Sequence, residues 1–351
     1  MKSLVLFLGI LMTTHLQAQK IWMWCEFSNR EEVATSLSLL LKNNIGVIRA
    51  VRPLSSEFSQ DLAIIEMLLK NGIKVKPWIL LPEKDGYWFS AFNPEKSILA
   101  VNEWLKLSHE AGIYLNDLVL DFEPPVDRLR QLRVYLGPLK IKSAKKLMAK
   151  NLTKAEYIAA RDTFQKAFDR WKEDEPEMKI HIVTTPLVLL DHRKDKVEQF
   201  LGLPIRGLKV DGLSFMVCRS EFMKFFPKVD SSFTGFFTHK AIKKITKNYN
   251  MPKDKLSIDL GIFGSFDFPE KTEGIAFSQL TSEMNQVFGQ GLKELHLYSL
   301  DNFLRDNKLN LLAETLKNFK ISCEIKLKAK DRTKWGLMRF VRFLFIPNSR
   351  H

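Results

Sequence analysis

The chain has 351 residues, of which 45% are apolar, and a formal net charge of +14. This length and apolar content suffice for a large globular core, and three cysteines are too few for a small fold held together by disulfides. Beyond the first eighteen residues, no uncharged stretch is long enough for a membrane-spanning helix, so we expect no transmembrane segment.

The first eighteen residues have the layout of a secretory signal peptide. Lys2 precedes an apolar run from Leu4 to Met12, and Ala18 provides a small residue before the expected cleavage point. We therefore predict that residues 1–18 are removed and that the protein is exported, either to the periplasm or outside the cell. The residue directly after the cleavage point is Gln19 and not a cysteine, so a lipid anchor is not expected.

After the signal peptide, short apolar segments with strand character alternate with segments of helical periodicity. The strands are near-continuously apolar, as is typical of a parallel sheet that is covered on both faces. The predicted strands are 21–27, 46–52, 74–81, 117–123, 179–189, 212–218, 255–263 and 294–300, and the predicted helices are 29–41, 59–69, 94–111, 154–171, 194–200, 239–249, 281–288 and 309–319.

Eight consecutive strand-then-helix units predict a closed (β/α)₈ TIM barrel over residues 19–319. The same alternation is compatible with an open, doubly wound sheet. We favour the barrel because no glycine-rich phosphate loop follows the first strand, as it would in a nucleotide-binding sheet.

Two basic segments account for the charge. Residues 128–154, an insertion after the fourth strand, carry nine Lys or Arg and no Asp or Glu, and the C-terminal extension 320–351 carries nine basic and two acidic residues. The rest of the chain is nearly neutral. This distribution predicts an anionic polymer as partner, and contact of the C-terminal extension with an anionic surface. Nucleic acid is not expected, because the chain contains no nucleic-acid-binding motif.

The fourth predicted strand, Asp117-Leu118-Val119-Leu120-Asp121-Phe122-Glu123, ends in two carboxylates one residue apart and is stopped by two prolines. Period-two geometry places Asp121 and Glu123 on one face, at the strand end where parallel barrels hold their active sites. Neighbouring carboxylates tend to retain one proton between them. The pair therefore predicts a general acid, Glu123, with an orienting partner, Asp121.

This strand resembles the fourth strand of the glycoside hydrolase family 18 (chitinase-like) barrels, whose signature is D-x-x-D-x-D-x-E. The resemblance implies that Glu123 is the catalytic acid and that Asp121 orients the N-acetyl group of the substrate. Asn116 and Val119 stand where the two earlier Asp residues of the signature would be. The D-x-E ending is also similar to family 25 lysozymes, which likewise cleave N-acetylhexosamine chains.

Later strands resemble family 18 as well. Residues 256–264 (LSIDLGIFG) resemble its seventh strand and 297–301 (LYSLD) its eighth, where Tyr298 takes the position of a Trp that floors the sugar subsite. The Met-x-Tyr-Asp sequence of the sixth strand is replaced by Met-Val-Cys-Arg at 216–219. Arg219 would then pair with a carboxylate of a different substrate, or the site would bind glycan without cleaving it.

The predicted strand ends supply further side chains to the same mouth of the barrel. No metal-ligand spacing occurs among Cys and His, and no Walker-type, G-x-S-x-G or H-E-x-x-H motif occurs, so no metal or cofactor is expected. The predicted substrate-binding residues are Glu26, Trp78, Trp88, Arg219, Asp259, Tyr298 and Asp301.

Together these patterns predict an exported glycoside hydrolase that cleaves an N-acetylhexosamine-containing polysaccharide by acid/base catalysis from Glu123, with Asp121 assisting. The basic segments favour peptidoglycan over chitin as the substrate. The alternative is a non-catalytic TIM-barrel protein that only binds glycan.

Overall fold

The structure is a computed structural model that describes residues 19–136, 152–191, 195–219, 230–261, 265–266, 272–273 and 276–321. Its main sheet contains a strand close to each position that the sequence predicts. The strands are β1 (Lys20–Cys25), β2 (Ile45–Val51), β3 (Val75–Ile79), β4 (Asp117–Phe122), β5 (Lys179–Thr184), β6 (Gly212–Met216), β7 (Leu256–Leu260) and β10 (Glu294–Leu297).

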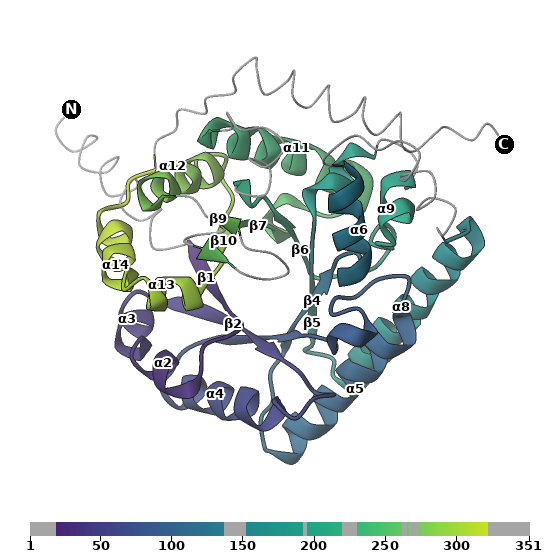
Figure 1. The fold of residues 1–351 in the computed structure, drawn as a ribbon, viewed down its shortest axis with the longest axis horizontal. Helices are drawn as coiled ribbons and strands as arrows, with labels where there is room; N and C mark the ends of the chain where they lie inside the picture. The colour runs from purple at the N-terminus through teal and green to yellow at the C-terminus, as the bar shows by residue number, and fades with distance from the viewer. Residues whose placement is uncertain are drawn as a thin grey trace, which may run out of the picture.

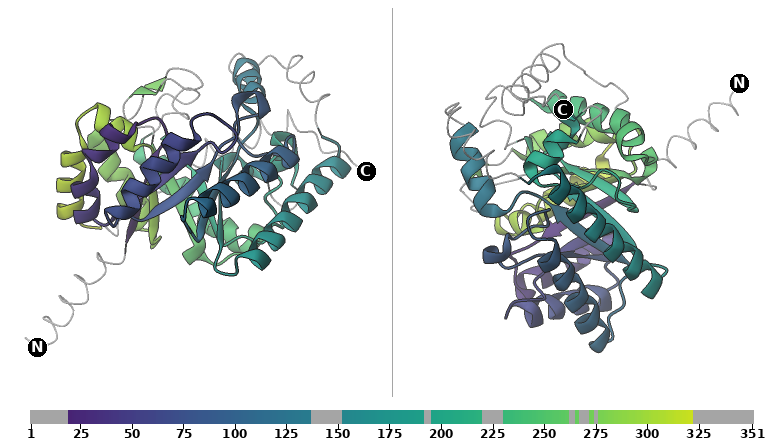
Figure 2. Two further views of the ribbon diagram at one scale, coloured as in Figure 1. Left: turned by 90° about the horizontal axis from the view of Figure 1, so that it is seen from below. Right: turned by 90° about the vertical axis from the view of Figure 1, so that its right-hand side faces the viewer.

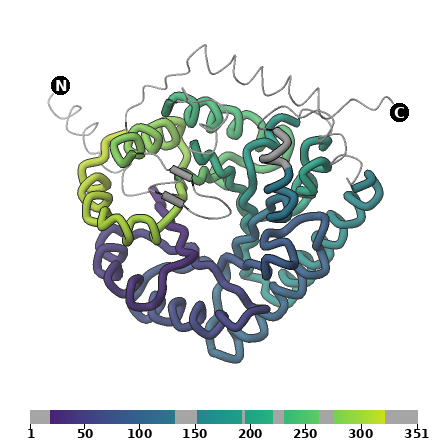
Figure 3. Tube along the Cα trace, in the orientation of Figure 1, coloured from purple at the N-terminus to yellow at the C-terminus, as the bar shows by residue number. Residues whose placement is uncertain are grey.

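These eight strands are parallel and close into one barrel, in the order β1-β10-β7-β6-β5-β4-β3-β2. The first and last strands complete the ring, with Lys20 opposite Glu294 and Met23 opposite Leu297. Figure 3 shows the purple start and the yellow end of the described chain side by side in the ring. The predicted closed (β/α)₈ barrel is confirmed, and the doubly wound alternative is wrong.

Helices surround the barrel, as Figure 1 shows. They are α2 (Arg30–Ala34), α3 (Leu37–Lys42), α4 (Phe58–Lys70), α5 (Pro94–Glu110), α6 (Val126–Leu136), α8 (Lys154–Asp174), α9 (Lys196–Leu201), α11 (Ser231–Tyr249), α12 (Phe277–Phe288), α13 (Leu300–Arg305) and α14 (Leu309–Asn318).

Three boundaries differ from the prediction for local reasons. The predicted helix 29–41 is split into α2 and α3, with Thr35 as the C-cap of the first. The predicted strand 179–189 ends early because Pro186, which lacks a backbone N–H, begins the 3₁₀-helix η3 (Pro186–Leu190). Helix α11 begins at Ser231, before the predicted residue 239, because the side chain of Asp230 caps it by accepting the N–H of Ser232.

Several short elements lie next to the strands in sequence. The 3₁₀-helix η2 (Glu83–Asp85) follows β3, η4 (Lys253–Lys255) precedes β7, and the antiparallel strands β8 (Ser265–Phe266) and β9 (Thr272–Glu273) follow β7. Figure 2 shows the β8–β9 hairpin and helix α6 on the same side of the barrel. Because both follow the carboxyl ends of strands, this side carries the predicted site.

Side chains of β4 alternate as period-two geometry requires. Leu118, Leu120 and Phe122 lie in the apolar layer between the strands and the helices, whereas Val119 belongs to a separate apolar cluster inside the barrel. Asp121 therefore shares the interior face with Val119, as the sequence predicts.

Large aromatic side chains fill the barrel interior. Trp22, Trp24 and Trp78 belong to the interior cluster, and the rings of Trp24 and Trp78 meet edge to face with centroids 4.7 Å apart. Gly46 lies opposite Trp22 in the β1–β2 register. A Cβ atom at Gly46 would lie only 2.3 Å from the Trp22 ring, so the large residue on one strand requires the small one on the next.

Charged side chains also cross the interior, and each has a partner. Lys76 Nζ lies 2.8 Å from Glu294 Oε1, which is 3.0 Å from His296 Nε2, and His296 Nδ1 is 2.7 Å from Asp259. Because charges buried without water need such partners, these four residues form one connected ion-pair chain. We refer to them as the interior ion chain.

Several predicted features lie outside the described residues. These are the signal peptide (1–18), most of the basic insertion (137–151) and the C-terminal extension after residue 321. In the described part of the chain, no helix combines the length and the apolar character that crossing a membrane requires.

The contact between Gly46 and Trp22 gives a stability prediction. Gly46→Ala should lower the free energy of unfolding by about 1–3 kcal/mol, because the added methyl group collides with the indole ring. In a Trp22→Leu background the same methyl group should cost much less, and urea unfolding of the four proteins measures this coupling. An equal loss in both backgrounds would show that the ring is not the obstacle.

Candidate active site

Strands β1, β4 and β7 bring acidic residues to the carboxyl end of the barrel. Glu26 directly follows β1, and Asp121 and Asp259 are the next-to-last residues of β4 and β7. All three are buried, with exposed fractions of 2%, 3% and 1%. Glu123, which follows β4, is half-buried. The two members of the predicted pair thus differ in their access to solvent.

Asp121 has surroundings that disfavour a negative charge. Its Oδ1 atom is buried and has no hydrogen-bond partner within the part of the chain that the structure describes. Burial, and then the charges of Glu123, Asp259 and Glu26, raise the pKa of Asp121 well above its usual value. The protonated form of this carboxyl group is therefore strongly favoured.

Asp259 is equally buried but well supplied with donors. It accepts hydrogen bonds from Trp24 Nε1 at 2.9 Å and from the hydroxyl of Ser214, and His296 Nδ1 lies 2.7 Å away. Burial works against a charged imidazole, but the carboxylates of Asp259 and Glu294 outweigh it and raise the pKa of His296. The donors that Asp121 lacks are thus concentrated on Asp259.

Glu26 accepts hydrogen bonds from two tyrosines. The hydroxyl of Tyr87 donates to Oε1 and that of Tyr298 to Oε2. Burial raises the pKa of Glu26 to about 7, although both tyrosine hydrogen bonds act in the opposite direction. Glu26 therefore changes its charge near neutral pH, where an exposed glutamate would be fully ionised.

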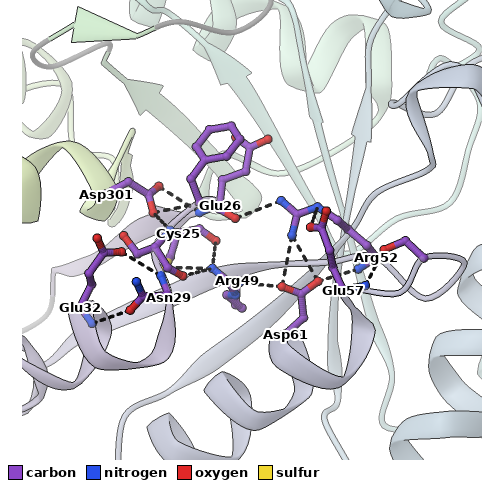
Figure 4. Close-up of polar contacts among 12 residues, drawn as sticks. Cys25, Glu26, Asn29, Glu32, Arg49, Arg52, Glu57, Asp61 and Asp301 are labelled. Carbon is purple, nitrogen blue, oxygen red and sulfur yellow. Dashed lines mark hydrogen bonds and ion pairs between the residues drawn. The ribbon is translucent and has the colours of Figure 1, made fainter.

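Asp301 binds the backbone N–H groups of the loop that carries Glu26, as Figure 4 shows. The carboxylate of Asp301 accepts the backbone N–H groups of Glu26 at 2.9 Å, Phe27 at 3.1 Å and Ser28 at 2.7 Å. Asp301 was predicted to bind substrate. In the structure, its carboxylate fixes the backbone beside Glu26.

Two arginines bind backbone carbonyl groups of the same loop. Arg52 Nη2 donates to the carbonyl of Glu26 at 3.0 Å, and Arg49 Nη1 donates to that of Ser28 at 3.3 Å. Asp61 of α4 pairs with both guanidinium groups, at 2.6 Å from Arg49 and 3.2 Å from Arg52. We call Asp301, Arg49, Arg52 and Asp61 the loop clamp.

The predicted sugar-contacting aromatics lie close to this site but are largely covered. Trp78 and Trp88 have exposed fractions of 3% and 7% and pack inside the barrel. Tyr87 meets Trp88 edge to face, with centroids 5.2 Å apart. Tyr298 is partly buried against the same cluster and directs its hydroxyl to Glu26.

Arg219 is engaged elsewhere. Its exposed fraction is 2%, and its Nε donates to Glu283 and its Nη2 to Gln279, both on helix α12. The guanidinium group of Arg219 thus forms an ion pair inside the protein, and its pairing with a substrate carboxylate stays a prediction. Sequence spacing could not show this, because Glu283 lies 64 positions away.

Two arginines of the basic insertion are described in full. Arg128 is buried, donates to the carbonyl of Phe200 at 2.9 Å and lies over the Phe92 ring, so burial lowers its pKa to about 10. Arg130 pairs with Glu83 at 2.8 Å on the surface. These two arginines are thus occupied within the barrel domain.

Sequence reasoning missed several residues that shape the site. His296 lies two positions before Tyr298 on β10, so the period-two rule that placed Asp121 would also have placed His296 inside the barrel. Tyr87 and Asp61 gave no such signal, because their partners come from other elements. Among the described residues, no group of three or more His, Cys, Asp and Glu side chains is arranged to hold a metal ion.

A closed (β/α)₈ barrel with buried carboxyl groups at the carboxyl ends of its strands is therefore the class of protein that these observations define. No protein-family model matches the sequence, and no curated protein matches it. Solved structures with a similar fold include several glycosidases.

The class V chitinase from Nicotiana tobaccum is 9% identical, with 85% of this chain and 99% of that chain covered and a TM-score of 0.49. The family 1 β-glucosidase from Thermotoga maritima is 13% identical, with 84% and 88% covered and a TM-score of 0.48. Active domain 2 of the chitinase from Pyrococcus furiosus is 10% identical, with 81% and 84% covered and a TM-score of 0.46. Among these structures, no family 25 lysozyme supports the second resemblance.

The loop clamp predicts a large stability effect at one residue. Asp61→Asn keeps the side-chain shape but leaves the buried Arg49 without its ion-pair partner, so the free energy of unfolding should fall by about 3–5 kcal/mol. Glu66→Gln, which breaks the exposed Glu66–Lys70 pair of the same helix, should cost at most about 0.5 kcal/mol. Similar small losses in both variants, measured by urea unfolding, would contradict the prediction.

Proposed function

We propose that this protein is an exported glycoside hydrolase that cleaves an N-acetylhexosamine-containing polysaccharide, with Glu123 as acid/base and Asp121 assisting. The observation that carries the proposal is the pairing of two unlike carboxyl groups. Asp121 is buried with an unsatisfied Oδ1 atom, and the half-buried Glu123 is the neighbour whose charge contributes most to its raised pKa. Such a pair retains one proton and can deliver it.

In the proposed reaction the acetamido group of the substrate acts as the nucleophile. Its N–H donates to Asp121 Oδ1, the atom that lacks a partner, while the shared proton passes to Glu123 and from it to the leaving glycosidic oxygen. The acetamide oxygen forms a bond to the anomeric carbon as the glycosidic bond breaks, giving an oxazolinium ion. Glu123 then takes a proton from water, which opens this ion and restores the acetamido group.

Peptidoglycan is our preferred substrate, ahead of chitin. The basic insertion begins five positions after Glu123, and a segment that follows a barrel strand leaves from the face that carries the site. Because Arg128 and Arg130 have partners within the protein, the remaining lysines and arginines of the insertion would supply the positive charge that an anionic polymer meets. Export through the predicted signal peptide would bring the protein to such a polymer.

A glycan-binding protein without catalysis is the second candidate. The observation that favours it is the sixth strand, where no tyrosine is present at 216–219 to position an acetamido group and Arg219 is committed to Glu283. Binding without new reducing ends would decide in its favour.

The acid role of Glu123 is tested by Glu123→Gln, which keeps the shape and removes the titrating proton. Glycan cleavage, measured as new reducing ends from peptidoglycan and chitin fragments, should fall by about 10²- to 10⁴-fold. Asp127→Asn, a control at an exposed carboxylate nearby, should leave cleavage unchanged. Undiminished hydrolysis by Glu123→Gln would end the assignment.

The basic insertion is tested through salt. Binding of peptidoglycan fragments should weaken steeply above about 0.15 M salt, where the screening length is roughly 8 Å. Replacing Lys140, Lys142, Lys145 and Lys146 with Gln should flatten this dependence and leave cleavage of a short neutral oligosaccharide intact. An equal loss on both substrates would show that the segment has a structural role instead.

A further inference from the structure

Glu26 uses its hydrogen-bonding groups within the protein. Its N–H donates to Asp301, its carbonyl accepts from Arg52, and its two carboxylate oxygens accept from Tyr87 and Tyr298. These four partners come from four different segments of the barrel. A side chain fixed in this way is poorly suited to grip a substrate, but its charge has a defined position.

A three-residue segment links Glu26 to Asp121. The Tyr87 hydroxyl donates to Glu26, and two positions later the N–H of Phe89 donates to the backbone carbonyl of Asp121 at 2.9 Å. Phe89 also forms an isolated parallel bridge with Phe122. The backbone between Tyr87 and Phe89 therefore ties the carboxyl group of Glu26 to the backbone of Asp121.

The charge of Glu26 also acts on Asp121. It is one of the charges that, after burial, Glu123 and Asp259, raise the pKa of Asp121. Around Glu26 itself, Asp301 disfavours ionisation and Arg52 favours it. The titratable and charged groups that face Glu26 are Tyr87, Tyr298, Asp301, Arg52 and Asp121.

We infer that Glu26 is a positioning residue for the catalytic proton: its fixed carboxylate adds to the hold of the Asp121–Glu123 pair on that proton. When Glu26 is ionised, its negative charge makes loss of the proton from the pair less favourable. The acid would then stay protonated at a higher pH than the pair could reach alone. This catalytic consequence depends on the proposed function, whereas the coupling between the carboxyl groups does not.

The test is Glu26→Gln, which removes the charge and keeps the shape. Carboxyl-carbon NMR of protein labelled in its aspartates should show the titration of Asp121 moving to lower pH, by on the order of one unit. The alkaline limb of the kcat/KM profile on chitin oligosaccharides should move in the same direction. Tyr87→Phe, which removes a donor to the carboxylate and so keeps Glu26 neutral to higher pH, should produce a smaller shift of the same sign.

Glu32→Gln is the matched control, because it removes an exposed charge six positions away at the start of α2. It should move neither titration nor profile. An unchanged Asp121 titration in both Glu26→Gln and Tyr87→Phe would overturn the inference and leave Glu26 with a structural role. A shifted titration in a protein that never cleaves glycan would support the coupling between the carboxyl groups and reject the proposed hydrolase.

Discussion

Burial of carboxyl groups inside the barrel is the constraint on which the rest of the site depends. A buried carboxylate is stable only where donors or cations meet it. Within the interior ion chain, His296 meets Asp259 and Lys76 meets Glu294. Glu26 accepts hydrogen bonds from two tyrosine hydroxyls. Asp121 receives no donor to its Oδ1 atom from the described residues. Burial beside the charges of Glu123, Asp259 and Glu26, with no such donor to Oδ1, therefore favours a proton on Asp121.

The loop clamp shows how the scaffold supports this distribution. Functional residues usually lie on loops that a rigid framework positions, and a loop free to move would let Glu26 reach water. Asp301 fixes the N–H groups of the loop, and Arg49 and Arg52 fix its carbonyls. Asp61 pairs with both arginines, so a helix on the outside of the barrel stabilises a carboxyl group at its mouth.

Periodicity predicted much of this arrangement. The alternation of apolar segments with helical segments predicted the eight strands and the barrel. The period-two geometry of the fourth strand placed Asp121 on the interior face. Periodicity could not predict the partners of the buried polar side chains, because tertiary packing determines them. Trp24 donates to Asp259 across 235 positions of sequence, and Arg219, which was predicted to bind substrate, pairs with Glu283. A residue type at a strand end thus indicates which groups gather there, but not which of them remain available.

The pairing of β1 with β10, which closes the barrel, also determines when the site forms during folding. Glu26 reaches Asp301 across 275 positions and Tyr298 across 272, so neither contact exists until the final strand has joined the first. Such distant contacts form late in folding, because a long stretch of chain must first be ordered. In an incomplete ring, Glu26 would be solvated and would titrate as an ordinary glutamate. The near-neutral titration of Glu26 therefore requires the closed barrel, and a fragment that lacks the last strand would not have it.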